Sequence, residues 1–213
     1  MLYIQPDALD DELLNLIASR NNISKYLDIP LQHCSEKLLK DMNRKGNAKD
    51  FLDKIKHIKK LVPECTLRTT FIVGFPGESE EDFEELCDFV TLAQFDYAGC
   101  FEYSNEEGSA SSKLENQVAD EVKYSRTNKL RDILDTISLN KLDEKIGNVY
   151  PVLIEGKEEG RFYGRAPFQA AEVDGVVFIS EYSEDEKIIP GSILNVKIQD
   201  SEGYDLVGVV FNG

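Results

Sequence analysis

The segment FIVGFPGESEEDFEEL (Phe71–Leu86) carries the clearest structural signal in the first part of the chain. An apolar run of β-branched and aromatic residues, typical of a buried strand, breaks at Gly74. A Phe-Pro-Gly turn follows, and Ser79 then begins a helix whose first turn is acidic. Asp82, three residues after Ser79, completes an approximate capping box. The segment therefore predicts a strand, a glycine corner and a helix in direct succession.

This acidic corner is a poor site for phosphate. Glycine-rich turns before helices often bind anions, but Glu78, Glu80, Glu81 and Asp82 would repel a phosphate here. Neither GxxxxGK[ST] nor GxGxxG occurs in the sequence. In parallel α/β architectures ligands bind where the strands end. The corner therefore suits a neutral or cationic ligand, such as an adenine ring or an aminoacyl ammonium group.

Strand and helix patterns alternate on both sides of this corner. The expected strands are Met1–Ile4, Tyr26–His33, Leu67–Gly74 and Tyr97–Ser104, with helices predicted around residues 9–20, 48–62 and from Ser79 onward. Such alternation indicates βα units and a parallel sheet. Four strands make half of an eight-stranded barrel or two-thirds of a six-stranded one. Because the pattern is already under way at Met1, we expect an excised fragment.

The character of the sequence changes after a long helix predicted over Val118–Ile146. Gly147 is placed to end that helix. Beyond it, five short strands alternate with Gly, Pro and acidic turns, which predicts a small antiparallel barrel of the OB type. We therefore predict an α/β domain over residues 1–146 and a small β-barrel domain over residues 147–213.

The charge of the chain restricts its partners. Forty acidic and 24 basic side chains give the 213 residues a net charge of −16. This charge disfavours nonspecific attraction to nucleic acid or anionic membranes and favours basic partners. The sequence has no apolar run long enough to span a bilayer and no signal-peptide pattern. We expect a cytoplasmic protein.

The cysteines do not form a metal-binding pattern. Cys34, Cys65, Cys87 and Cys100 are widely spaced, no CxxC pair occurs, and the chain has only two histidines. Zinc and iron–sulfur sites need closely spaced ligands, so we expect no metal site made by this chain alone. Buried, reduced thiols are the expected alternative.

Polar residues occur on the expected strands in pairs that share a face. Asp28 and Gln32 form one pair, Arg68 and Thr70 a second, and Glu102 and Ser104 a third. Polar side chains on several inward faces predict an open, ligand-holding interior. The alternative is that Arg68 pairs with Asp28 or Glu102 only to satisfy a buried charge.

Three segments resemble the radical S-adenosylmethionine (SAM) methylthiotransferase family. They are YLDIPLQHCSEKLLKDMNR, LRTTFIVGFPGESEEDFEEL and FEYSNEEGSAS, and the segment after Gly147 looks like the TRAM domain of that family. The resemblance covers nearly the whole chain. It implies half of a partial (β/α)6 radical-SAM barrel, followed by a small antiparallel OB-like β-barrel, the TRAM domain.

The resemblance also implies a reaction that attaches a methylthio group to an unactivated C–H bond. In this family a [4Fe–4S] cluster cleaves SAM, the 5′-deoxyadenosyl radical abstracts hydrogen, and a second cluster in a separate N-terminal domain is associated with sulfur delivery. The CxxxCxxC that ligates the first cluster is absent from this sequence, as are the cysteines of the N-terminal domain. We expect both upstream of Met1. The chain alone is therefore predicted to be inactive, with neither catalytic residues nor metal ligands of its own.

By the same resemblance, particular residues would serve the cofactor and the substrate. The expected SAM-binding residues are Gln32, Arg68, Thr70, Gly74, Gly77 and Glu78, with Arg68 placed to meet the methionine carboxylate. The expected substrate-side residues are Asp28, His33, Glu102 and Ser104. A chemical role for His33 stays open beside the alternative of a hydrogen-bonded structural histidine.

Two substrate classes compete within the family: an adenosine in tRNA and an aspartate of a small-subunit ribosomal protein. The form DIPLQH resembles the ribosomal-protein enzymes, whereas the tRNA enzymes more often show HLPLQSGS. From Gly147 to Gly213 there are 12 acidic and 5 basic residues, a net charge of −7. An RNA-binding barrel needs a basic stripe with interleaved aromatic residues. We therefore predict a basic small-subunit ribosomal protein, or the ribosome, as partner, with tRNA the alternative.

We interpret the aromatic residues of the small barrel as core and its acidic residues as a contact surface. We interpret the aromatic residues Phe162, Tyr163, Phe168 and Phe178 as barrel core. The expected contact patches for a basic partner are Glu158-Glu159, Glu184-Asp185-Glu186 and Asp200-Ser201-Glu202. An alternative of another class is a non-catalytic module that binds a basic protein.

Overall fold

The computed structural model describes residues 1–106, 108–182 and 188–211 and divides the chain into two compact units. The first unit comprises Met1–Ile23 with Leu27–Ile137, and the second comprises Ser24–Tyr26 with Ser138–Gly213. The division falls inside helix α5 (Asp120–Asp143). The domain boundary expected after residue 146 stays a prediction.

The first unit contains a three-stranded sheet in the order β1-β2-β3. Its strands are β1 (Tyr26–Asp28), β2 (Thr66–Val73) and β3 (Tyr97–Glu102). Strands β2 and β3 pair in parallel, from Arg68 opposite Tyr97 to Val73 opposite Glu102. The chain after β1 also runs parallel to β2, with Gln32 bridged to Phe71. All three strands therefore end at the same edge, which is where a parallel sheet places its ligands.

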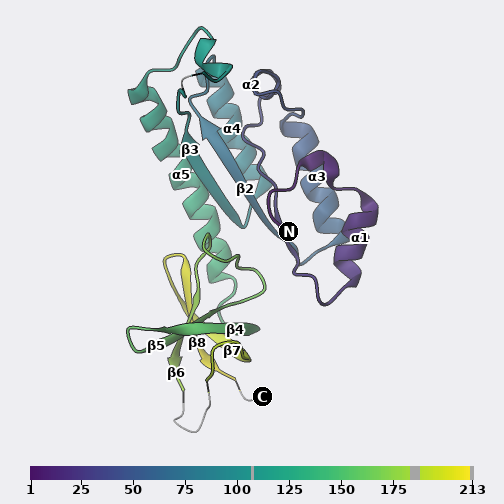
Figure 1. Cartoon of the computed structure of the whole chain (residues 1–213), viewed down its shortest axis with the longest axis vertical. Coiled ribbons are helices and arrows are strands. Elements are labelled where there is room, and N and C mark those ends of the chain that lie inside the picture. The colour runs from purple at the N-terminus through teal and green to yellow at the C-terminus, as the bar shows by residue number, and fades with distance from the viewer. Residues whose placement is uncertain (107, 183–187, 212–213) are drawn as a thin grey trace. The chain divides into compact units, whose positions relative to one another are not determined.

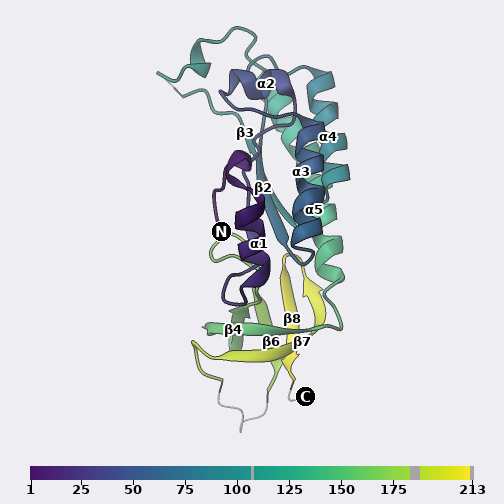
Figure 2. The same cartoon turned by 90° about the vertical axis from the view of Figure 1, so that its right-hand side faces the viewer.

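Helices alternate with these strands, as the sequence predicts. They are η1 (Pro6–Ala8), α1 (Asp11–Ser19), α2 (Glu36–Asp41), α3 (Ala48–Leu61), α4 (Glu80–Ala93), η2 (Ser111–Lys113) and α5. Figure 2 shows α3, α4 and α5 along one face of the sheet. Helix α3 presents Phe51, Ile55 and Ile58 to the interior because these residues recur at helical spacing.

Two of the expected strands differ in the structure. Met1–Ile4 is not a regular strand, because Tyr3 takes a left-handed conformation (φ 58°), although Asp28 N still donates to Met1 O at 3.0 Å. The strand expected over Tyr26–His33 ends at Asp28. Pro30 has no N–H to donate, and Gln32, also left-handed (φ 71°), forms only an isolated bridge with Phe71. The described sheet therefore has three strands rather than four.

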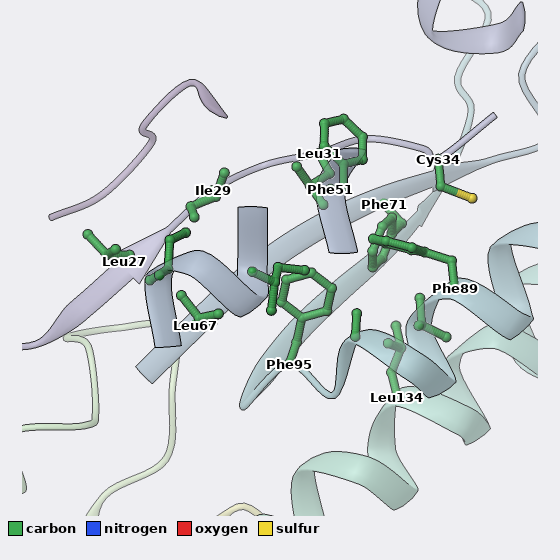
Figure 3. Close-up of a cluster of buried hydrophobic side chains, with 14 of the residues drawn as sticks. Leu27, Ile29, Leu31, Cys34, Phe51, Leu67, Phe71, Phe89, Phe95 and Leu134 are labelled. Atoms are coloured by element: carbon green, nitrogen blue, oxygen red, sulfur yellow. The ribbon is translucent and has the colours of Figure 1, made fainter. Parts of the chain in front are cut away.

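The core of the first unit lies between the sheet and its helices. Along β2, Leu67, Phe71 and Val73 are buried, whereas Arg68, Thr70 and Ile72 are half-buried. Figure 3 shows the rings of Phe71, Phe89 and Phe95 gathered with aliphatic side chains from the strands and helices. The ring of Phe71 lies at 6.2 Å and 6.0 Å from those of Phe89 and Phe95. Burial of each such side chain stabilises the fold by about 1.5–3 kcal/mol.

The second unit contains a closed five-stranded barrel in the order β4-β5-β6-β8-β7 (Figure 1). The strands are β4 (Val149–Glu158), β5 (Arg161–Arg165), β6 (Val177–Glu181), β7 (Ile193–Glu202) and β8 (Asp205–Val210). Neighbouring strands are antiparallel except β6 and β8, which pair in parallel. The expectation of an all-antiparallel barrel is wrong at that pair, because β8 returns beside β6 only after β7 has intervened in the chain.

Aliphatic side chains fill the barrel. The buried set includes Val152, Ile154, Val177, Ile179, Val196, Ile198 and Leu206. Phe168 is buried as expected, but Phe162, Tyr163 and Phe178 are only half-buried. Inward-facing β-branched residues already occupy the narrow interior, so the barrel-core interpretation is wrong for these three rings.

Candidate functional site

The glycine corner, residues 74–78, connects the end of β2 to the start of α4. Gly74 and Gly77 both take left-handed conformations, with φ of 76° and 84°. A Cβ on Gly74 would lie 2.3 Å from Cγ of Lys123, so this position requires glycine on steric grounds as well. The capping box is confirmed: Asp82 N donates to Ser79 Oγ, and Ser79 N donates to Asp82 Oδ2 at 3.0 Å.

Glu78 turns into the protein from this corner. Its side chain is fully buried; Oε2 accepts from Gly74 N at 2.5 Å, and Oε1 accepts from Nη1 of Arg126 at 2.9 Å. Burial raises the pKa of Glu78, against the effect of the Gly74 hydrogen bond and the Arg126 charge. Glu78 therefore holds the backbone of the corner in place and does not face open space.

His33 is buried beside Glu78. Its Nδ1 accepts a hydrogen bond from Ser35 N at 3.0 Å, which leaves the proton of the neutral ring on Nε2. Nε2 lies 4.0 Å from Glu78 Oε2 and has no hydrogen-bond partner within the described part of the chain. Burial lowers the pKa of His33 to about 4, so the imidazole is neutral at pH 7.

A cavity of about 430 Å³ lies at the edge where the strands end. Gln32, Ile72, Phe75 and Tyr103 line it together with residues 41–44, 110 and 111. Ile72 and Phe75 give the cavity an apolar wall. Gln32 Oε1 and the Tyr103 hydroxyl are buried there without a hydrogen-bond partner among the residues that the structure describes. An unpaired buried polar atom costs about 1–3 kcal/mol, so the cavity suits a ligand with an apolar ring and N–H or O–H donors.

Arg68 and Thr70 share the half-buried face of β2 with Ile72, but they do not line this cavity. Nη1 of Arg68 lies 3.2 Å from Oδ1 of Asp28, which is buried. This pairing is the structural alternative that the sequence left open for Arg68. Gly77 also lies outside the cavity; its N–H donates to Asn116 O at 2.9 Å.

Glu102 and Ser104 lie apart from the cavity. Glu102 is opposite Val73, on the other face of the sheet from Arg68 and Thr70, and is exposed. Ser104 is exposed and donates to Glu106 Oε1 at 2.7 Å. The structure thus brings Gln32 together with Phe75 and Tyr103, which sequence reasoning missed. Their position directly after two parallel strands was the available signal, but their apolar rings suggested core.

The cysteines do not fit an iron–sulfur cluster. All four are buried thiols outside any disulfide, and no group of three or more His, Cys, Asp or Glu side chains that could hold a metal occurs in residues 1–106, 108–182 and 188–211. Burial raises the pKa of Cys100 to about 12 and that of Cys34 still further. Protonated thiols are poor ligands, because metals bind the thiolate.

Comparison with known proteins identifies the class. Residues 1–90 match the model of the radical SAM superfamily, and residues 146–211 match the TRAM domain. Among solved structures, the radical SAM enzyme coproporphyrinogen III oxidase of Escherichia coli has a similar fold, with a TM-score of 0.55 at 10% identity over 78% of this chain and 44% of that one. The predicted fold class, a partial radical-SAM barrel followed by an OB-like TRAM barrel, is confirmed.

Relatives found by sequence comparison indicate which branch of the radical SAM superfamily the chain resembles. Proteins named ribosomal protein uS12 methylthiotransferase RimO, from Clostridium kluyveri and Clostridium acetobutylicum, are each 43% identical over all of this chain and 47% of their own length. The protein of that name from Proteus mirabilis is 44% identical over 98% of this chain and 46% of its own. Over its whole length the chain is therefore similar to radical SAM methylthiotransferases. It spans about half the length of the curated relatives it matches.

Proposed function

We propose that this chain is part of a radical SAM enzyme that transfers a methylthio group to an aspartate of a small-subunit ribosomal protein, uS12. The chain supplies the SAM-binding half-barrel and the substrate-recruiting TRAM barrel. The observation that carries the proposal is the 43% identity, over the whole chain, to proteins named for methylthiotransfer to uS12. The aspartate follows from the resemblance of DIPLQH to the ribosomal-protein branch of the family.

In this proposal the Gln32 cavity holds the adenosyl part of SAM. Gln32 Oε1 and the Tyr103 hydroxyl are buried acceptors without partners in the described chain, and Ile72 and Phe75 supply the apolar wall that a purine ring requires. Arg68, Thr70 and the glycine corner form the adjoining binding surface. When bound, SAM supplies the hydrogen-abstracting chemistry of the superfamily. The residues of this chain bind and orient it and exclude water.

The cluster that activates SAM is proposed to use ligands from outside this chain, since the four buried cysteines do not fit one. We therefore expect the chain alone to be inactive. His33 is fully buried, so its proposed role on the substrate side depends on opening of the site.

The TRAM barrel is proposed to recruit the basic ribosomal protein. Its net charge of −7 favours such a partner in the cytoplasm and opposes RNA. One observation favours the tRNA alternative: the half-buried rings of Phe162 and Phe178 lie beside Lys157 and Arg161, as in many single-strand binders. However, Arg161 is paired with Glu202 at 3.3 Å. A non-catalytic module for a basic protein is the remaining alternative. Of the expected contact patches, Glu184-Asp185-Glu186 lies outside the described residues.

The cofactor site is tested by replacing Gln32 with glycine. Glycine accepts the left-handed backbone without strain and removes the unpaired oxygen, so Gln32→Gly should raise the free energy of unfolding by about 1 kcal/mol. The same change should weaken SAM binding roughly fivefold, as expected for one lost hydrogen bond. Isothermal titration of the chain with SAM and urea unfolding measure the two effects.

Gln94→Gly is the matched control, because Gln94 is also left-handed (φ 53°) and is exposed at the end of α4. The Gln94→Gly variant should show a similar rise in the free energy of unfolding, and its affinity for SAM should be unchanged. Equal SAM affinity in Gln32→Gly and the unsubstituted chain would remove Gln32 from the cofactor site. A stoichiometric iron–sulfur cluster on the chain alone, with formation of 5′-deoxyadenosine, would contradict the proposed location of the ligands.

A further inference from the structure

Two side chains of α5 contact the glycine corner, although α5 is distant from the corner in the sequence. The alkyl chain of Lys123 covers Gly74, and Arg126, one turn later, reaches Glu78. Both side chains are only 9% exposed. The sequence suggested no role for either residue, because α5 is polar over most of its length.

Arg126 is fixed by several contacts at once. Its Nη1 donates to the Glu78 backbone oxygen at 3.2 Å and to Glu78 Oε1 at 2.9 Å, and its Nη2 donates to Glu80 Oε2 at 2.9 Å. The guanidinium also lies over the ring of Phe83, 5.4 Å from its centroid. A planar group with these partners has little freedom to move.

Glu78 connects Arg126 to the backbone of the corner through hydrogen bonds. While Oε1 is bound to Arg126, Oε2 accepts the hydrogen bond from Gly74 N. The carboxylate therefore joins α5 to the residue where β2 ends. Removal of Arg126 would leave a buried carboxylate without its countercharge, which is strongly unfavourable.

We propose that Arg126 is a positioning residue that fixes the conformation of the glycine corner through the Glu78 carboxylate. The contribution of this positioning to SAM binding rests on the proposed function, which assigns the glycine corner to the cofactor. We call the contacts that join Arg126 to Glu78 and Glu78 to Gly74 the clamp. The clamp lies within the first unit and can be measured without a ligand.

The charge on Glu78 gives the clamp a pH signature. The charged or titratable groups facing Glu78 are Arg126, which also holds Glu80, His33, which is neutral above its pKa of about 4, and Cys100 of β3, whose thiol pKa is raised to about 12 by burial. Burial raises the pKa of Glu78, and Arg126 opposes that rise. In Arg126→Met the pKa of Glu78 should therefore rise further above its unfolded value. A raised carboxyl pKa contributes stability that is lost as pH increases, so this variant should be weakest at neutral pH.

The test compares Arg126→Met, Glu78→Gln and the double variant with Arg131→Met. Arg131 lies on the same helix and donates to Cys100 O at 3.3 Å, away from the corner, so it is the matched control. Thermal unfolding is followed at about pH 7.5 and about pH 5, because a raised carboxyl pKa makes the loss of stability larger at the higher pH. Hydrogen exchange of the Gly74 amide is measured in the same samples.

Arg126→Met should lower the Tm more than Arg131→Met at the higher pH, and the excess should shrink at the lower pH. Adding Glu78→Gln should restore part of the Tm and abolish the pH dependence. Exchange at Gly74 should be roughly tenfold to a hundredfold faster in Arg126→Met, the effect of losing one charged hydrogen bond. The clamp would be overturned if Arg126→Met lowered the Tm only as much as Arg131→Met at both pH values. It would also be overturned if the Tm losses of Arg126→Met and Glu78→Gln were additive in the double variant. A confirmed clamp with unchanged SAM affinity would support the positioning role and count against the proposed cofactor location.

Discussion

At the scale of single residues, Gln32, which follows the end of β1, departs from the extended backbone of a strand. It has a left-handed backbone and a buried oxygen without a partner in the described chain, yet its N–H and C=O are bound to Thr70 O and Ile72 N. The main-chain bonds hold the residue in a conformation that its side chain does not stabilise. Strain that persists in this way is common at ligand sites, which is why Gln32 anchors the proposed cofactor cavity.

His33 makes the stability of the chain depend on pH. Its pKa falls from 6.5 to about 4 through burial, so the unfolded state binds more protons between these values. The stabilisation is complete above pH 6.5 and is lost as pH falls toward 4, with a total of about 3 kcal/mol. We expect His33→Gln to flatten the dependence of the unfolding free energy on pH in this window.

Urea unfolding at several pH values measures this slope. His57→Gln is the control, because His57 is partly exposed and pairs with Asp11 at the surface. A flattening of the slope in His33→Gln beyond any change in His57→Gln is the predicted result. If His33→Gln kept the full slope, the buried-histidine account of acid sensitivity would be wrong.

At the scale of elements, the start of α4 depends on Ser79. The hydroxyl of Ser79 accepts from Asp82 N, and Asp82 in turn accepts from Ser79 N. Ser79→Ala should therefore reduce the unfolding free energy by about 1 kcal/mol, the usual cost of losing an N-cap. Ser19→Ala, at the exposed end of α1, should change it by less than about 0.5 kcal/mol. Equal effects in urea unfolding would show that the capping box contributes nothing.

The elements that the sequence predicts well are those with strong local signals. Helix α4 has its cap and acidic first turn, and β2 has eight residues of strand-forming type between clear breaks. Residues 1–4 and 29–33 were overpredicted as strand, because only the surrounding chain imposes the left-handed turns at Tyr3 and Gln32. The parallel pairing of β6 with β8 is likewise nonlocal. No local pattern encodes it.

At the scale of the whole molecule, the sequence predicted part of the candidate site. The position of Gln32 and the glycine corner after strands predicts that they serve a ligand site, and their assignment to the cofactor stays a prediction. The sequence also offers the Arg68–Asp28 pairing as an alternative, and the structure contains that pairing. Phe75 and Tyr103 were missed because a ring that lines a cavity has the same hydrophobic pattern as a ring in a core. The role of Arg126 depends on a contact across 48 positions of the chain, which a single sequence does not reveal.

The proposed recruitment of a basic ribosomal protein by the acidic chain is tested by competitive binding. The 213-residue chain is titrated with purified protein uS12 and with tRNA at low and high salt. We predict binding to uS12 that weakens as salt rises, little binding to tRNA, and slower association with uS12 when Glu158, Glu159, Asp200 and Glu202 are all reversed to lysine. Tight, salt-sensitive binding to tRNA with none to uS12 would contradict the account.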